Sequence, residues 1–371
     1  MVFERSSTTR AGNPLPPNLF IAFRAFVLAI ASLASATTAV FAQSPSLPPY
    51  AVDLAQTSIS GLSSGGFMAA QYEVAYSNSL VGAGIVAAGP FYCSGSQPHT
   101  SFVTNATTTC MKPIGSGPDA ASLVESAKQF AEEGKIDPLD NLKRHKVYLF
   151  SGSKDPTVKT KVVDQTLRFL ELAGVPETNI KYVKTTSAGH ALITDNPADA
   201  ACEITAPPFI NNCGMDQSHD ILEQIYGKLN PPTIALSGKI IAFNQREFID
   251  SDRSSMGDVA YAYVPAACEH DTCKVHVALH GCRQGAAIIG DRYYTTTGYN
   301  EIADTNRIIV LYPQVQPSEP IPYNPKGCWD FWGYSSTDSV HPNFHTKAAP
   351  QMQAIHKMVE RLGQARSKTT N

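Results

Sequence analysis

Short apolar stretches alternate with amphipathic stretches through the first half of the chain. Runs rich in Ile, Val, Leu and aromatic residues predict strands at residues 57–60, 81–88, 146–150 and 180–183. Apolar residues spaced three and four apart predict helices at residues 67–76, 120–133, 157–173 and 220–229. This alternation is typical of a mostly parallel sheet with helices on its faces.

The alternation starts again after Pro231-Pro232. Strands are expected at residues 239–243, 259–264, 274–279 and 308–312, with a helix between the last two strands and a closing helix at about residues 346–362. We therefore predict a single α/β domain over residues 43–371. The alternative, two domains divided near Pro231, would leave neither half with all the motifs described below.

Residues 1–42 have the pattern of an export signal. Arg24 precedes an apolar stretch at residues 26–40, and Val40-Phe41-Ala42 has the small-residue spacing of a cleavage site before Gln43. The alternative is a membrane anchor. However, the stretch lacks the purity of a spanning helix, because four hydroxyl residues interrupt it: Ser32, Ser35, Thr37 and Thr38. We expect a secreted protein, extracellular or periplasmic, without stable membrane insertion.

In an exported protein the eight cysteines are expected to form disulfides, because an oxidising compartment favours them. Their order suggests four local pairs: Cys93 with Cys110, Cys202 with Cys213, Cys268 with Cys273, and Cys282 with Cys328. Sequence alone leaves the connectivity open, since eight cysteines allow about 105 pairings. A zinc site from Cys268, His270 and Cys273 is the alternative, but no second ligand pair supports it. We treat His341 and His345 as solvated loop residues, since Pro342 argues against a helix that would align them.

Composition limits the partners. With 371 residues, 43% hydrophobic content and a formal net charge of -3, the chain has enough apolar residues for a large core. No basic excess indicates nucleic acid, and no acidic tail indicates a solvating or metal-buffering role. A small molecule or a neutral polymer fits better, and the oligomeric state is not determined.

One serine has the setting of a catalytic nucleophile. Gly61-Leu62-Ser63-Ser64-Gly65 matches the G-x-S-x-G elbow, and it lies between a predicted strand and a predicted helix, as that motif requires. The alternative is a glycine-serine turn without function, because both residues are frequent in loops. The flanking elements favour the elbow, with Ser63 as the nucleophile.

A base and an acid follow in the order expected for a serine triad. His190 comes after the strand at 180–183, and Asp155 comes directly after the strand at 146–150. The alternative role of Asp155 is to cap the helix that follows it. Asp164 and Asp195 compete less well, because the first lies within a predicted helix and the second follows the histidine.

The oxyanion hole is expected from two backbone N–H groups, those of Ser64 and Cys282. The loop His280-Gly281-Cys282 would supply the second of these N–H groups. In an ordinary α/β-hydrolase the corresponding loop precedes the nucleophile in the sequence, whereas here it follows Ser63. Moving residues 235–365 in front of residue 50 restores the usual order. We therefore predict a circularly permuted α/β-hydrolase fold; an ordinary strand-to-helix turn at residues 280–282 is the alternative.

Five segments together resemble the secreted poly(3-hydroxybutyrate) depolymerases, within that group the single-domain, circularly permuted type. They are SGLSSGGFMAAQ at 60–71, GSKDP at 152–156, AGH at 188–190, LHGC at 279–282 and GCWD at 327–330. The resemblance covers about residues 50–365 and implies Ser63, Asp155 and His190 as the triad. It also implies hydrolysis of short-chain polyhydroxyalkanoate polyesters or oligoesters. No separate linker and polymer-binding domain is recognised, so we expect any adsorption to use the catalytic domain's own surface.

The expected double displacement needs no metal or organic cofactor. Trp329 and Trp332 are candidates for the wall that receives substrate, with core packing as the alternative for each. An esterase of soluble aryl or feruloyl esters is the rival enzyme. A secreted binding protein on an inactive hydrolase scaffold is the rival without catalysis, and the intact triad residues argue against it.

Overall fold

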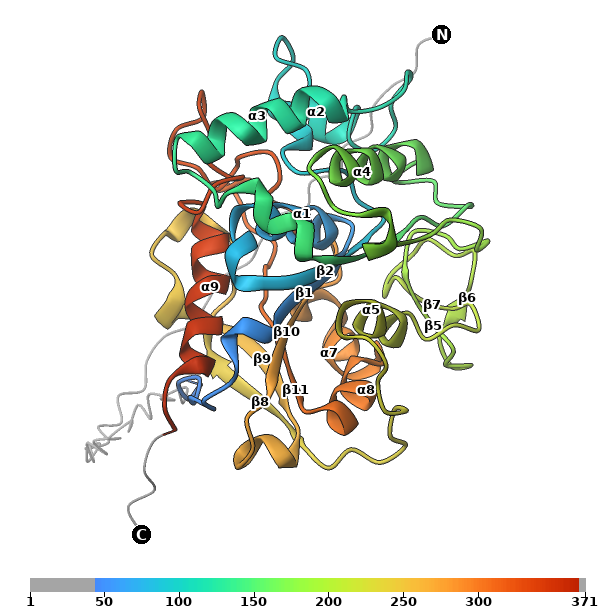
Figure 1. The fold of residues 1–371 in the computed structure, drawn as a ribbon, viewed down its shortest axis with the longest axis vertical. Coiled ribbons are helices and arrows are strands. Elements are labelled where there is room, and N and C mark those ends of the chain that lie inside the picture. Colours follow the sequence, from blue (N-terminus) through green and yellow to red (C-terminus); the bar gives the residue numbers. More distant parts are fainter. Residues whose placement is uncertain (1–43, 367–371) are drawn as a thin grey trace, which may run out of the picture. The chain divides into compact units, whose positions relative to one another are not determined.

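The apolar runs form one eight-stranded sheet within residues 44–366, the part of the chain that the computed structural model describes. In spatial order the strands are β4 (Ile180–Val183), β3 (Lys146–Phe150), β2 (Leu80–Val86), β1 (Thr57–Leu62), β10 (Lys274–Leu279), β11 (Ile308–Tyr312), β9 (Val259–Val264) and β8 (Lys239–Asn244). Strands β4 to β11 pair in parallel, whereas β9 and β8 pair antiparallel at one edge (Figure 1). The predicted α/β-hydrolase class is confirmed.

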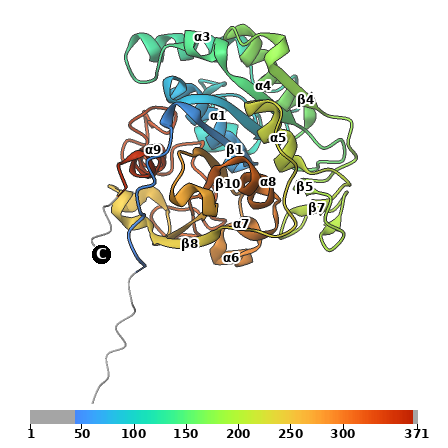
Figure 2. The same ribbon diagram turned by 60° about the horizontal axis from the view of Figure 1, so that its bottom comes forward.

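Helices bury both faces of this sheet, so that almost every residue of its central strands is buried. One face packs against α1 (Ser64–Ala75), α2 (Phe102–Thr107), α3 (Ala120–Glu132), α4 (Thr160–Leu172) and α9 (Pro350–Gly363). The other packs against α5 (Gln217–Tyr226), α6 (Ala286–Ile289), α7 (Arg292–Thr296) and α8 (Tyr299–Asn306). Figure 2 shows α3 and α4 on the side of the sheet opposite α7 and α8.

Two buried serines in the central strand β1 are paired with a histidine of β10. The His276 ring lies 2.7 Å from the Ser58 hydroxyl through Nδ1 and 2.7 Å from the Ser60 hydroxyl through Nε2. Burial lowers the pKa of His276 to about 3, so the ring is neutral and both accepts and donates. This network satisfies polar groups directly below the predicted nucleophile.

Several element boundaries differ from those predicted. The closing helix α9 begins at Pro350, because proline fits the first helical position and residues before it form turns. The one helix expected between β10 and β11 is three short ones. Gly290 and Gly298, at φ +64° and +84°, interrupt it.

A small second sheet was not predicted. It contains β5 (Leu192–Thr194), β7 (Ile210–Asn212) and β6 (Ala200–Ala201), in that order. Strands of two or three residues are too short to produce an alternating pattern, so their pairing depends on contacts between distant positions. The sheet follows His190 directly and is closed by the Cys202–Cys213 disulfide.

The structure joins the eight cysteines in the four expected pairs. Because Cys268 and Cys273 are bonded to each other, they do not form the zinc site considered as the alternative. Within residues 44–366, no group of three or more His, Cys, Asp or Glu residues could hold a metal. One histidine expectation is wrong: His345 is buried among Phe91, Tyr92 and Phe130 rather than solvated.

The start and the end of the described chain meet beside β1. Tyr50 N–H and Val52 N–H donate to the carbonyl of Leu362, and Ala51 N–H donates to that of Gln364. The end of α9 therefore lies next to the segment that enters the nucleophile strand. The export signal expected at residues 1–42 lies outside the described residues, among which no helix is long and apolar enough to cross a membrane.

Candidate active site

Ser63 lies on a strained turn between β1 and α1. Its backbone has φ +57° and ψ -121°, a conformation that costs about 1–3 kcal/mol for a residue with a side chain. Gly61 and Gly65 permit the turn, since a Cβ on Gly61 would lie 2.4 Å from the Gly65 carbonyl carbon, and one on Gly65 would lie 2.4 Å from the Leu279 carbonyl oxygen. The motif glycines are therefore required by close backbone contacts.

The turn places Ser63 at a cavity of about 340 Å³. Most of its lining is apolar, and it includes Phe67, Met111, Val158, Phe331 and Trp332. Ser63 itself is 8% exposed, so its hydroxyl is open to this cavity but shielded from bulk water. Such a site suits an ester carbonyl carried on an apolar chain.

Asp155 and His190 are brought together by two loops at the carboxyl ends of β3 and β4. The His190 Nδ1 donates to Asp155 Oδ2 at 2.7 Å, because an ionised carboxylate can only accept. Ser153 N–H and Lys154 N–H donate to carbonyls of the histidine loop, those of Thr186 and Ala188. Because Nδ1 donates to the carboxylate, the neutral ring leaves His190 Nε2 as the acceptor nitrogen, as a general base requires.

The carboxylate of Asp155 also holds the turn that precedes α4, but it does not cap that helix as considered from sequence, because the N-cap residue is Lys159. Its Oδ1 accepts the N–H groups of Thr157 at 2.7 Å and Val158 at 3.0 Å, and α4 therefore begins only at Thr160. Asp155 is 4% exposed and His190 6%. The two functions use different oxygens, so the turn and the pairing with histidine coexist.

Ser63 and His190 are not hydrogen-bonded to each other in the described residues, although the structure places both at the same end of the parallel strands. In unliganded enzymes such contacts are often long and shorten when substrate binds. Asp164 lies elsewhere, on α4, where it accepts hydrogen bonds from Tyr182 and Lys184. Asp195 is exposed and lines a different hollow.

The backbone N–H groups of Ser64 and Cys282, both near Ser63, have no acceptor within residues 44–366. Ser64 is the first residue of α1, whose N–H has no partner in the helix. A Cβ on Gly281 would lie 3.4 Å from the Ser63 Cβ, so the loop of Cys282 approaches the nucleophile closely. These are the donors that an oxyanion hole needs.

His280 holds the peptide between Gly281 and Cys282, whose N–H is the expected second donor. Burial lowers its pKa to about 4, and the neutral ring donates from Nδ1 to the Gly281 carbonyl at 2.8 Å while Nε2 accepts from Val315 N–H at 3.1 Å. In a trans peptide the carbonyl and the next N–H point in opposite directions. Holding the Gly281 oxygen therefore directs the Cys282 N–H away from the ring. Sequence reasoning missed this role, although the motif contains the residue.

The two tryptophans differ. Trp332 lines the cavity, as expected. Trp329 is fully buried, packs against His280 with ring centroids 5.6 Å apart and does not line the cavity. The expectation that Trp329 contacts substrate is wrong, because the indole is packed in the core against His280 and its neighbour Cys328 is bonded to Cys282.

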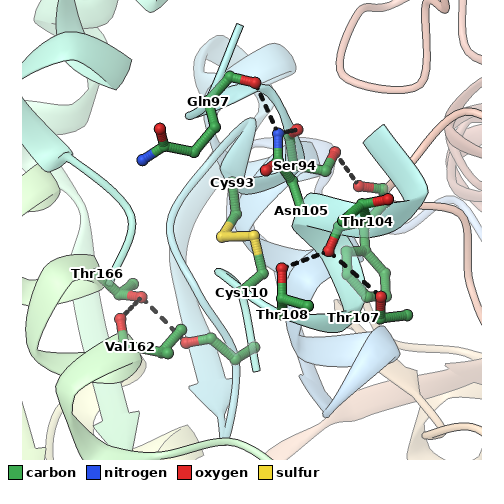
Figure 3. Close-up of a disulfide and its surroundings, with 12 residues drawn as sticks. Cys93, Ser94, Gln97, Thr104, Asn105, Thr107, Thr108, Cys110, Val162 and Thr166 are labelled. Atoms are coloured by element: carbon green, nitrogen blue, oxygen red, sulfur yellow. Dashed lines mark hydrogen bonds between the residues drawn. A yellow bond between two sulfur atoms is a disulfide. The ribbon is translucent and has the colours of Figure 1, made fainter. Parts of the chain in front are cut away.

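Residues of α2 and Met111 also line the cavity, and the Cys93–Cys110 disulfide closes this segment of the chain (Figure 3). Asn105 is buried inside this segment, where its amide donates to the carbonyls of Ser94 at 2.8 Å and Gln97 at 3.0 Å. Asn105 also begins an Asn-Ala-Thr glycosylation sequon, but its nitrogen is inaccessible in the fold. The wall, including Met111, was not predicted from sequence.

We expect Cys328→Ser to lower turnover much more than Cys268→Ser. The first substitution frees the loop of Cys282, which lines the cavity and whose N–H is the expected second oxyanion donor. Loss of one such donor typically costs about 10²–10³-fold in turnover. The second opens a local clip between β9 and β10 that does not line the cavity. Steady-state kinetics of both variants tests this, and equal activities would disprove the coupling.

No family model matches the chain. A poly(3-hydroxybutyrate) depolymerase from Delftia acidovorans is 42% identical over 330 residues, which are 87% of this chain; the chain spans 63% of the length of that relative. A polyhydroxybutyrate depolymerase from Talaromyces funiculosus is 37% identical over 333 residues, 85% of this chain and 92% of the relative.

Solved structures give the same result. A PHB depolymerase from Penicillium funiculosum superposes with a TM-score of 0.76 at 35% identity and covers 86% of this chain and 98% of its own. A PHB depolymerase variant complexed with an R3HB trimer has a TM-score of 0.75 at the same identity and coverage.

Proposed function

This chain belongs to the polyhydroxybutyrate depolymerase family, and we propose that it is a secreted serine esterase that hydrolyses the ester bonds of short-chain polyhydroxyalkanoates. One observation carries the proposal. A serine on a strained elbow shares a mostly apolar cavity with Cys282, whose N–H has no acceptor in the described residues, and a histidine–aspartate pair joined at 2.7 Å lies at the same end of the parallel strands. This arrangement suits acyl transfer from an ester of an apolar chain.

The proposed reaction is a double displacement. The Ser63 hydroxyl attacks the ester carbonyl carbon while His190 Nε2 takes its proton, and Asp155 stabilises the imidazolium that forms. The N–H groups of Ser64 and Cys282 stabilise the charge on the carbonyl oxygen. The alcohol leaves with the proton from His190, and water then hydrolyses the acyl-enzyme by the same steps. No step uses a metal or an organic cofactor.

Secretion is supported by the four disulfides, which persist in oxidising compartments and are rare in reducing ones. The pattern of residues 1–42 supports it independently, because it matches an export signal. Amino-terminal sequencing of the mature protein from culture medium tests the expected start at Gln43. A mature protein that retains residues 1–42 would contradict it.

The function is tested with a suspension of poly(3-hydroxybutyrate) and, in parallel, a soluble aryl ester. We expect the wild-type protein to clear the suspension and release hydroxybutyrate, and Ser63→Ala to do neither. Rapid hydrolysis of the aryl ester without release of hydroxybutyrate would favour the soluble-ester alternative. No hydrolysis of either substrate would favour a binding protein.

We further propose that the fold is circularly permuted. The hydrogen bonds between residues 50–52 and the end of α9 support this, because they set the last helix where it would lead directly into β1. The strands of the C-terminal part, β10 and β11, lie in the middle of the sheet rather than beside it. Both features are those of a chain whose ancestral connection ran from α9 into the nucleophile strand.

A rearranged protein that begins near residue 235 and joins residue 365 to residue 50 through a short linker should fold and keep activity. The ends to be joined already lie within hydrogen-bonding distance, so the linker adds little loop-closure cost. Circular dichroism and ester hydrolysis provide the measurement. A soluble but inactive, disordered product would contradict the permutation.

A further inference from the structure

One charged side chain lines the cavity of Ser63. Of the described residues around that cavity, Lys326 alone carries a charge, and its neighbours are apolar or uncharged polar groups such as Asn324 and Thr107. A cation next to an apolar ester site is not needed to bind a neutral polyester, which carries no charge along its chain. Its position makes it available to an anionic group of a substrate bound at this cavity.

Lys326 is held close to the oxyanion loop. Its carbonyl accepts the N–H of Arg283 at 2.7 Å, and Arg283 directly follows Cys282. Two residues beyond Lys326, Cys328 is bonded to Cys282. The backbone of the lysine is thus fixed relative to the candidate oxyanion donor on both sides.

The ammonium group of Lys326 has no partner within residues 44–366: no carboxylate lies within salt-bridge distance, and no side-chain hydrogen bond is formed. The neighbouring cation, Arg283, is placed differently, with its guanidinium 5.3 Å from the centre of the Phe209 ring. Lys326 is therefore the cation left for a ligand at this cavity.

We propose that Lys326 binds the terminal carboxylate of hydroxyacid oligoesters, so that the enzyme prefers anionic oligomers over neutral esters of the same length. This inference rests on the proposed function and specifies its substrate. In such an oligomer the free carboxylate lies on the alcohol side of the ester that is cleaved. Lys326 would thus hold the leaving part while Ser63 attacks the carbonyl of the acyl part.

Each hydrolysis reaction produces a new carboxylate end that can bind Lys326 in the next reaction. Cleavage breaks the bond between the carbonyl carbon and the ester oxygen, and the alcohol part leaves as a hydroxyacid that keeps its carboxylate. Water then releases the acyl part as a carboxylic acid, which ionises at neutral pH because such groups have pKa values near 4. Each turnover therefore gives the shortened oligomer the charged end that Lys326 recognises.

The experiment compares a hydroxybutyrate trimer that ends in a carboxylate with the same trimer ending in a carboxamide, which is neutral and of similar size. The variants are Lys326→Met, which keeps an unbranched side chain, and Lys326→Arg, which keeps the charge. Lys228→Met is the matched control, because Lys228 is also exposed but does not line the cavity.

We expect the wild-type protein to have a kcat/KM about two- to fivefold higher for the carboxylate trimer, the range typical of exposed ion pairs. Lys326→Met should remove this preference by slowing only the carboxylate trimer, and Lys326→Arg and Lys228→Met should keep it. Raising the salt from about 0.02 M to about 0.5 M should shrink the preference, because the Debye length falls several-fold.

Hydrolysis of both trimers at equal rates by the wild-type protein would overturn the role of Lys326 and leave the esterase function intact. The same conclusion follows if Lys326→Met slows hydrolysis of both trimers equally, since the lysine would then shape the cavity wall and would not bind the carboxylate. Absence of hydrolysis of either trimer by the wild-type protein would overturn the proposed function, and this inference with it.

Discussion

Ser63→Ala is expected to reduce ester hydrolysis by about 10⁴-fold or more while the protein keeps its fold. The substitution removes the only atom that forms the acyl-enzyme in the proposed reaction. It leaves the elbow backbone in place, because the contacts that shape the turn come from Gly61 and Gly65. Residual hydrolysis would come from the oxyanion donors and from binding alone.

Ser64→Ala provides the matched control, one residue away on the same turn. Ser64 contributes its N–H in the proposed reaction, and its hydroxyl is buried without a hydrogen-bond partner in the described residues. Its removal should therefore change turnover little. Steady-state kinetics, circular dichroism and mass spectrometry of a trapped acyl-enzyme distinguish the two serines. An inactive Ser64→Ala beside an active Ser63→Ala would reverse the assignment.

Asp155 and His190 are expected to act as one unit, so that their effects on turnover do not multiply. Asp155→Asn is the informative change, because the amide oxygen can still accept the N–H groups of Thr157 and Val158 while its NH₂ group faces His190 Nδ1. The histidine would then adopt the wrong tautomer. A loss of about 10³–10⁴-fold in kcat is expected by analogy with triads in which this change has been made.

The double variant Asp155→Asn/His190→Ala should be little slower than His190→Ala, because without the base the orienting acid has nothing to orient. Asp155→Ala separates the two functions of this residue. It should lose thermal stability as well as turnover, since the turn before α4 also depends on the carboxylate. Losses that multiply in the double variant would show that one of the two residues has a different role.

The sequence predicted most of the sheet closely. The boundaries of β3, β4, β9, β10 and β11 coincide with the predicted ranges. For β3, β10 and β11 the reason is their burial, since a parallel strand between two helical layers must be a short apolar run ended by loop residues. The apolar runs do not determine the spatial order of the strands in the sheet. It depends on pairings such as that of β1 with β10, whose residues are more than two hundred positions apart.

The triad residues could be proposed from local patterns, because each follows the carboxyl end of a strand in a recognisable glycine-containing loop. The walls of the cavity could not. Met111 and Lys326 come from loops with no periodic pattern, and they reach the site because disulfides and backbone hydrogen bonds fold those loops over Ser63. No local signal distinguishes Lys326 from an ordinary surface lysine.

The sequence by itself determined the elements, the elbow around Ser63, and the residues that follow each strand, because these depend on neighbours within a few positions. Only the tertiary structure decided the direction of individual side chains. Trp329 and Trp332 belong to one short motif, yet the first is buried against His280 and the second lines the cavity. His345 likewise enters an aromatic cluster of the core despite its place in a polar loop. Which way such a residue faces is set by packing between distant segments, and no pattern within its own segment encodes it.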